Sequence, residues 1–237
     1  MNKINLVIKQ IGDRQGGQHG VVRWLMAQFN GIYFWKNNAG IRHNILEISK
    51  FPDMSLFKKN KKIFIDENLI AIFAGYEDTT LARVNRFEFL KFADKQYNII
   101  VLRDPYNLFA SKIYNWTKNS PHKRQQYSKK LKVWKQKARE VLNKECYFIN
   151  FNKWFVNKKY RKEIISWFPE FTFTDDNKEL VRGLGKSSFD KKEFNGKASQ
   201  MNLLKRYKTV IDDPLMKNLI EDKEVTELSN QIFGKII

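Results

Sequence analysis

The sequence predicts an α/β fold: a single domain in which a mainly parallel central sheet is flanked by helices. Short apolar runs rich in β-branched residues alternate with longer segments whose apolar residues recur at helical spacing. At 237 residues the chain is long enough for one well-filled domain and short for two, so we expect one domain over residues 1–237. A hydrophobic fraction of 42%, with six Trp and nineteen Phe, supports a substantial core.

The apolar runs are the expected strands, and the periodic segments between them are the expected helices. Strands are expected at residues 4–11, 31–35, 45–48, 62–65, 69–74, 98–102 and 146–150. Helices are expected at residues 17–29, 81–93, 105–116, 121–142, 158–167, 198–210 and 223–233. This alternation favours parallel strands with helices on both faces. The polar segment 174–196 is the one long irregular stretch, which is typical of a loop that closes over a ligand.

The first strand leads into a glycine-rich turn that ends at a helix. The turn reads GDRQGGQHG over residues 12–20, and the helix after it carries Val22, Leu25, Met26 and Phe29 on one face. Glycine permits close backbone approach, and the first N–H groups of a helix favour an anion, so this arrangement suits a phosphate. We expect a side chain at Gly17 to intrude on that ligand or on a backbone angle that only glycine tolerates. A tight structural turn is the alternative interpretation.

Neither glycine-rich stretch is a Walker A loop. In the turn at residues 12–20, no Gly-Lys-Ser/Thr follows, so the usual magnesium-binding hydroxyl is missing. The later GLGKSS at residues 183–188 contains the Gly-Lys-Ser letters, but it follows no predicted strand and lacks the earlier glycine at the required spacing. The sequence therefore does not predict a nucleoside triphosphate site of that type.

A second candidate anion site follows the strand at residues 98–102, whose β-branched run is typical of a strand buried on both faces. Asp104 is the expected N-cap and Pro105 the first residue of the next helix. Arg103 therefore lies at the carboxyl end of a central strand, where open α/β sheets bind ligands, and Ser111 lies in the first turns of the helix. A guanidinium and a hydroxyl facing one point suit a phosphate. The alternative is an Arg103–Asp104 surface pair beside an ordinary helix serine.

Together these motifs resemble the sulfotransferase family, and in particular its bacterial and viral sulfotransferase-like members. RQGGQH at residues 14–19 resembles the family's 5′-phosphosulfate loop, and VLRDPYNLFAS at residues 101–111 resembles its 3′-phosphate motif. Further similarity lies in YED (76–78), INFNKWF (149–155), YRKEI (160–164), GKSSFD (185–190) and FNGKASQMNLLKRYK (194–208). In the loop, Gln15 and Gly17 stand where the commoner pattern has Ser and Thr or Ser. Backbone amides, Arg14 and His19 are therefore left to bind the anion.

The resemblance implies a P-loop-NTPase-like sulfotransferase fold and a sulfonate transfer from 3′-phosphoadenosine-5′-phosphosulfate (PAPS). The acceptor would be the hydroxyl or amine of an unknown molecule such as a glycan, and no metal is expected. Arg14 aligns with the family residue that bridges the sulfonate and its leaving phosphate oxygen. Lys186 and Ser187 would close over the 3′-phosphate, with Phe189 near the adenine. The implied donor-binding residues are Arg14, Gln15, Gly16, Gly17, Gln18, His19, Arg103, Ser111, Lys186, Ser187 and Phe189.

Sulfonyl transfer also needs a base for the incoming hydroxyl. His43 is one candidate, because an imidazole titrates near neutral pH. Glu77 and Asp78 are the others, because they follow the apolar run 69–74 and are expected at the ligand edge of the sheet. We favour Glu77. The alternatives are a loop histidine without a role and a carboxylate pair that caps the next segment, while His19 is expected to donate to phosphate.

The net charge of +19 attracts anions of many kinds. Much of it lies at residues 123–139, where apolar residues recur at helical spacing, so we expect a surface helix with a buried apolar stripe and a solvated basic face. Two alternative functions remain: a non-catalytic nucleic-acid-binding protein and a nucleotide-dependent kinase of related fold. No nucleic-acid-binding motif of the usual kinds is visible, and the missing Walker residues oppose the kinase.

The sequence predicts a cytoplasmic protein. Its single cysteine, Cys146, lies in an apolar run, so no disulfide framework exists and a reducing compartment fits. No apolar run approaches the roughly 18 residues that span a bilayer. The apolar stretch at the amino terminus is too short for a signal peptide.

Overall fold

The computed structural model describes residues 4–36, 58–59, 66–85, 93–180, 189–190 and 193–237. They contain a six-stranded sheet in the order β3-β2-β4-β1-β5-β6. The strands are β1 (Ile4–Gly12), β2 (Gly31–Lys36), β3 (Lys58–Lys59), β4 (Asp66–Glu77), β5 (Ala93–Leu102) and β6 (Tyr147–Asn150). Neighbouring strands from β2 to β6 pair in parallel, and β3 pairs antiparallel to β2 at the edge. The predicted α/β class with a mainly parallel sheet is confirmed.

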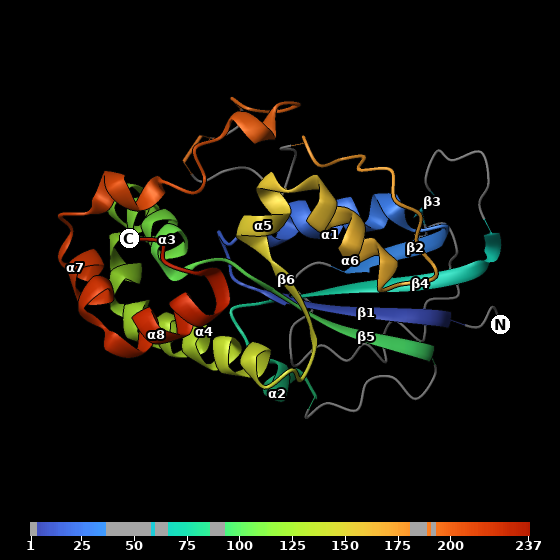
Figure 1. Ribbon diagram of the computed structural model, residues 1–237, viewed down its shortest axis with the longest axis horizontal. Helices are drawn as coiled ribbons and strands as arrows, with labels where there is room; N and C mark the ends of the chain where they lie inside the picture. Colours follow the sequence, from blue (N-terminus) through green and yellow to red (C-terminus); the bar gives the residue numbers. More distant parts are fainter. Residues whose placement is uncertain (1–3, 37–57, 60–65, 86–92, 181–188, 191–192) are drawn as a thin grey trace.

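Helices cover both faces of this sheet (Figure 1). One layer is formed by α1 (Gln18–Gln28), α5 (Phe151–Val156) and α6 (Lys158–Ser166). The other is formed by α3 (Pro105–Asn119), α4 (Tyr127–Leu142), α7 (Pro214–Glu221) and α8 (Lys223–Phe233). Shorter helices are α2 (Leu81–Asn85) and the 3-10 helices η3 (Pro121–Gln126), η5 (Ala198–Gln200) and η6 (Arg206–Val210).

Alternate side chains of the central strand β1 pack against the two helical layers. In β1, Val7 and Ile11 pack with the layer that contains α3 and α4, whereas Leu6 and Ile8 pack with the layer that contains α1. All four side chains are buried. Because both faces of the sheet are covered, its central strands are mostly apolar where the two layers bury them, and this is why their positions could be predicted.

Several expected elements differ from the observed ones. The helix expected at residues 198–210 is wrong: the structure has the short turns η5 and η6 there. Backbone groups in this stretch bond to side chains instead, since Arg103 donates to the Leu203 carbonyl and Asn107 Nδ2 donates to the Leu204 carbonyl at 3.1 Å. The helix expected at 121–142 begins as η3, and that expected at 81–93 is wrong at its end, because Ala93 begins β5. The strands expected at 45–48 and 62–65 lie outside the described residues.

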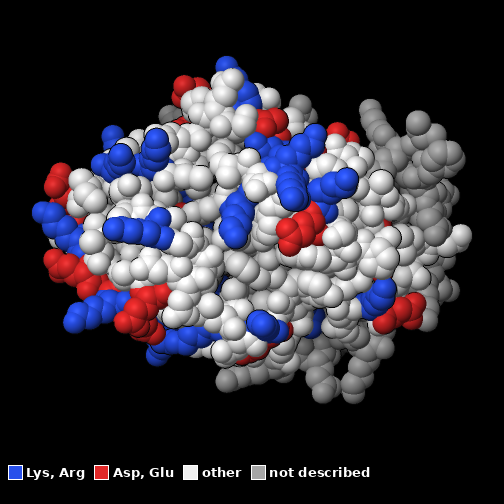
Figure 2. Space-filling model, viewed as in Figure 1, with Lys and Arg blue, Asp and Glu red and all other residues white. Residues whose placement is uncertain are grey.

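The basic helix α4 has the expected apolar stripe, and its basic face is solvated only in part, at residues such as Lys129 and Lys132. Tyr127, Leu131, Trp134, Ala138 and Val141 are buried. Several of its cations are paired with carboxylates from other elements: Lys130 with Asp78 at 2.9 Å, Lys135 with Asp222 at 2.7 Å and Lys137 with Asp13 at 2.6 Å. On the face in Figure 2, Lys and Arg side chains form several separate groups with Asp and Glu among them. Part of the net charge is therefore used inside the fold.

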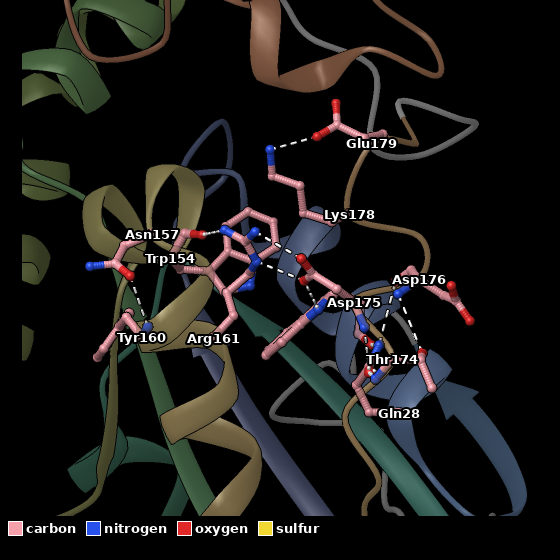
Figure 3. Close-up of polar contacts among 11 residues, drawn as sticks. Gln28, Trp154, Asn157, Tyr160, Arg161, Thr174, Asp175, Asp176, Lys178 and Glu179 are labelled. Atoms are coloured by element: carbon pink, nitrogen blue, oxygen red, sulfur yellow. Dashed lines mark hydrogen bonds and ion pairs between the residues drawn. The ribbon is translucent and has the colours of Figure 1, made fainter.

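Buried polar contacts anchor the start of the irregular segment that follows α6 (Figure 3). The Arg161 guanidinium donates to both carboxylate oxygens of Asp175, at 2.7 and 2.8 Å. Trp24 Nε1 donates to the same carboxylate at 3.0 Å. Gln28 Oε1 accepts from the N–H groups of Thr174 and Asp175 at 2.6 and 3.1 Å. Residues 174–176 are thus tied to α1 and α6.

The far end of this segment is tied back to its beginning through Glu179. Its carboxylate accepts from the Ser199 N–H at 2.8 Å, and its carbonyl accepts from the Gly196 N–H at 3.0 Å. Lys178 lies against the Phe155 ring on α5 and pairs with Glu179 at 2.7 Å. These hydrogen bonds hold the backbone at residues 196 and 199 next to Glu179.

Candidate anion-binding site

The turn between β1 and α1 lies at the carboxyl edge of the sheet, as predicted. Gly16 N–H donates to the Asp13 carbonyl at 2.9 Å, and Gly20 N–H is bonded to the Gly17 carbonyl at 2.9 Å. Gln15 and Gly17 have φ values of +67° and +83°. The first turn of α1 leaves N–H groups without intrahelical partners, so the turn has the shape of an anion cradle.

Two features of the structure require glycine at position 17, one of them expected from the sequence. A Cβ added to Gly17 would overlap the ring of Phe151, the buried first residue of α5. The positive φ of Gly17 also favours glycine. The expectation that the backbone angle at position 17 requires glycine is therefore confirmed, the protein core fills the space beside it, and the expectation about the ligand stays a prediction.

The loop side chains converge on Glu77 at the end of β4. Arg14 Nε donates to Glu77 Oε2 at 2.6 Å, and Gln18 Nε2 donates to Glu77 Oε1 at 3.0 Å. His19 Nε2 lies 3.2 Å from Glu77 Oε1, and its ring packs edge-on against Trp35. The hydrogen bond from Arg14 to Glu77 raises the pKa of Arg14. The structure thus brings together Arg14, Gln18, His19 and Glu77, four of the residues that the sequence singled out.

Asp78, the neighbouring candidate base, is occupied by cations. Its carboxylate accepts from Lys112 Nζ at 3.2 Å and from Lys130 Nζ at 2.9 Å. Burial alone would raise the pKa of Asp78, but the two lysines more than offset this and hold it well below its ordinary value. Such a carboxylate is a poor proton acceptor, so Asp78 is better explained as a structural anion.

Arg103 and Ser111 come together as predicted, and a second arginine joins them. Arg103 Nη1 donates to Ser111 Oγ at 3.3 Å, and Arg206 Nη1 donates to the same oxygen at 3.3 Å. Ser111 is fully buried, and the two arginines are 2% and 6% exposed. Arg103 also contacts the Gln15 carbonyl at 3.4 Å, which joins this site to the glycine turn.

This pair of guanidinium groups is electrostatically unusual. Within the described part of the chain, no carboxylate lies at ion-pair distance from Arg103, and its buried Nε has no hydrogen-bond partner. Burial first, and then the charge of Arg206, lowers the pKa of Arg103 to about 9. Burial also lowers the pKa of Arg206, which pairs with Asp190. Buried cations of this kind need a counter-ion, and a bound anion would supply one.

Phe189 lies next to this site. Its ring stacks on that of Tyr114, with centroids 4.0 Å apart, and the Arg206 guanidinium lies over the Phe189 ring at 4.7 Å. Tyr114 is one helical turn beyond Ser111 on α3, so both face the same side. Three other expected site residues, His43, Lys186 and Ser187, lie outside the described residues.

Sequence reasoning missed Arg206 and Lys112. Arg206 lies in a basic stretch in which nothing distinguishes one cation from the next. Lys112 lies next to the apolar residues Leu108, Phe109 and Ile113, in the part of α3 from Pro105 to Ile113 that the structure buries. A lysine in such a position requires a buried partner.

Comparison with models of known protein families and with curated proteins gives no match to this chain. Within the described residues, no helix combines the length and apolar character that crossing a membrane requires. The same residues contain no group of three His, Cys, Asp or Glu side chains arranged to hold a metal ion. Fold and site together define an α/β protein with a parallel sheet and a candidate anion-binding site at its carboxyl edge.

Proposed function

We propose that this protein is a sulfotransferase that takes a sulfonate group from PAPS and transfers it to the hydroxyl or amine of an acceptor. One observation carries the proposal: two buried guanidinium groups, those of Arg103 and Arg206, converge on the Ser111 hydroxyl beside a glycine turn. A phosphate oxygen group is the ligand that such a set of donors fits. The proposal includes a P-loop-NTPase-like sulfotransferase fold.

The nucleotide has two anionic ends, and the site offers two groups of donors. Arg103, Ser111 and Arg206 would hold the 3′-phosphate, with the aromatic rings of Tyr114 and Phe189 beside the adenine. The turn at residues 14–17 and the first N–H groups of α1 would hold the 5′-phosphosulfate end. The contact between Arg103 and the Gln15 carbonyl links the two groups, so the spacing between them is set by the fold.

In the transfer, the acceptor oxygen forms a bond to sulfur while the bond from sulfur to the leaving phosphate oxygen breaks. Arg14 would neutralise the charge that develops on that leaving oxygen. To do so, its guanidinium must leave Glu77, to which it is bonded at 2.6 Å. Glu77 Oε2 would then be available to accept the proton of the acceptor hydroxyl. Its side chain is 7% exposed, and His19 and Gln18 keep it in place.

Arg14→Ala is expected to separate binding from turnover. Arg14 has a side chain that is 58% exposed, so its loss should leave the fold and the binding of adenosine 3′,5′-bisphosphate intact. Turnover should fall by about 100-fold or more, the scale of losing one preorganised transition-state contact. The measurement combines calorimetric binding of the bisphosphate with transfer of labelled sulfonate to a panel of glycans, lipids and small alcohols. Full turnover in Arg14→Ala would remove Arg14 from the mechanism.

A further inference from the structure

A cluster of buried charges lies beneath the turn that joins β1 to α1. Lys112, on α3, is 2% exposed, and its Nζ donates to the Arg14 carbonyl at 2.9 Å and to Asp78 Oδ1 at 3.2 Å. The same Asp78 oxygen accepts from the Arg14 N–H at 3.3 Å. One ion pair therefore holds both backbone polar groups of Arg14, the first residue of the candidate phosphosulfate loop.

Asp78 is itself held firmly. Its φ of +53° is uncommon for a residue with a side chain, and such a conformation persists where the surroundings specify it. Its N–H donates to the Gly12 carbonyl at 2.9 Å, which ties it to the end of β1. Lys130 Nζ, from α4, binds its second carboxylate oxygen at 2.9 Å. Asp78 thus connects β1, β4, α3 and α4 directly below the turn.

The cluster also carries a surplus of positive charge. Two ammonium groups, those of Lys112 and Lys130, share the one carboxylate of Asp78, while Lys137 is matched by Asp13. The low pKa of Asp78 keeps its carboxylate ionised through the neutral range. The surplus charge at the base of the turn favours an anion above it.

We propose that Lys112 and Asp78 are positioning residues for the 5′-phosphate end of the nucleotide, which they orient through the backbone of Arg14 without touching it. The inference rests on the proposed function, because it assumes that the turn binds the 5′ end. When the pair is broken, the two peptide units that flank Arg14 lose their fixed orientation, and the turn that follows at residues 15–18 loses its support from α3. The contacts to Ser111 are made by Arg103 and Arg206 and not by this pair.

The test compares Lys112→Met and Asp78→Asn with the unmodified protein, using calorimetry with adenosine 3′,5′-bisphosphate and with adenosine 3′-monophosphate. Each variant should bind the bisphosphate about 10- to 100-fold more weakly, the scale of losing a hydrogen bond to a charged group. Binding of the 3′-monophosphate should be unchanged. Asp78→Asn keeps the shape of the side chain and an acceptor oxygen, so it serves as the milder variant should Lys112→Met fold poorly.

Lys135→Met is the matched control, because Lys135 also pairs with two carboxylates, those of Asp222 and Glu224, but lies away from the turn. It should lower thermal stability without changing either affinity. The double variant Lys112→Met/Asp78→Asn should lose no more bisphosphate affinity than the worse single variant, because the two residues act as one unit.

The outcomes are distinct. If both ligands lose affinity equally, or if the two single losses add in the double variant, the pair has a general structural role and the inference is overturned. Unchanged bisphosphate binding in both single variants also overturns it, and leaves the proposed function standing. If the unmodified protein binds neither nucleotide, the proposed function fails and the inference fails with it.

Discussion

Gly17→Ala should lower the free energy of unfolding by about 2–5 kcal/mol. A side chain in the left-handed region costs roughly 1–2 kcal/mol, and overfilling a packed core costs about 1–3 kcal/mol more. Both costs apply at Gly17, whose φ is +83° and whose added Cβ would overlap the buried ring of Phe151. Urea unfolding followed by circular dichroism measures the change.

Gly20→Ala is the matched control for this prediction. Gly20 lies one turn further along α1, and a Cβ added there would meet the Trp154 ring at an ordinary 3.6 Å. Within a helix, alanine is favoured over glycine by about 0.5–1 kcal/mol, so this variant should be slightly more stable than the unmodified protein. If the two variants were equally stable, the contact between the turn and α5 would not be what requires glycine at position 17.

Arg103→Met should reduce the affinity for adenosine 3′,5′-bisphosphate by about 2–4 kcal/mol, the scale of losing charge-assisted contacts to a phosphate. Affinity for adenosine 5′-monophosphate, which lacks the 3′ group, should change little. The variant should also be less stable, because the carbonyls of Gln15 and Leu203 lose their buried donor. The comparison of two ligands on one variant separates binding from this loss of stability.

Arg124→Met serves as a control for the removal of an arginine that is not at the site. Arg124 makes two hydrogen bonds to Asp213, at 2.8 and 2.9 Å, and its side chain is 31% exposed. Its loss should leave both affinities unchanged. Equal losses of affinity for both nucleotides in Arg103→Met would remove Arg103 from the 3′ position.

The strands of the sheet could be predicted because each is marked by a pattern of neighbouring residues. The runs at residues 4–11 and 98–102 are mostly apolar, and the structure buries most of both on two faces. The Asp104 cap and Pro105 mark the start of α3, which the structure confirms, with Asp104 accepting from the Asn107 N–H at 2.8 Å. The same Asp-Pro signal stands at Asp213 and Pro214, where α7 begins, so this local pattern marks that helix as well.

The remaining features depend on contacts between distant parts of the chain. The apolar residues at 198–210 recur at helical spacing. However, the side chains of Arg103 and Asn107 donate hydrogen bonds to backbone carbonyls in this stretch, so tertiary contacts override the local pattern. The use of Asp78 as a lysine-bound anion depends on α3 and α4, which no local pattern of residues 76–78 reveals. Arg206 and Ser111 are 95 residues apart in the sequence, and only the folded chain brings the guanidinium to the hydroxyl.

Calorimetric titration of the unmodified protein tests whether Arg103, Ser111 and Arg206 form a 3′-phosphate site. The ligands are adenosine 3′,5′-bisphosphate, adenosine 5′-monophosphate, ATP with magnesium and a single-stranded oligonucleotide. The bisphosphate should bind at least about tenfold more tightly than the 5′-monophosphate, a difference of about 1.4 kcal/mol for the 3′ group. Equal binding of these two ligands, or tighter binding of ATP or of the oligonucleotide, would contradict it.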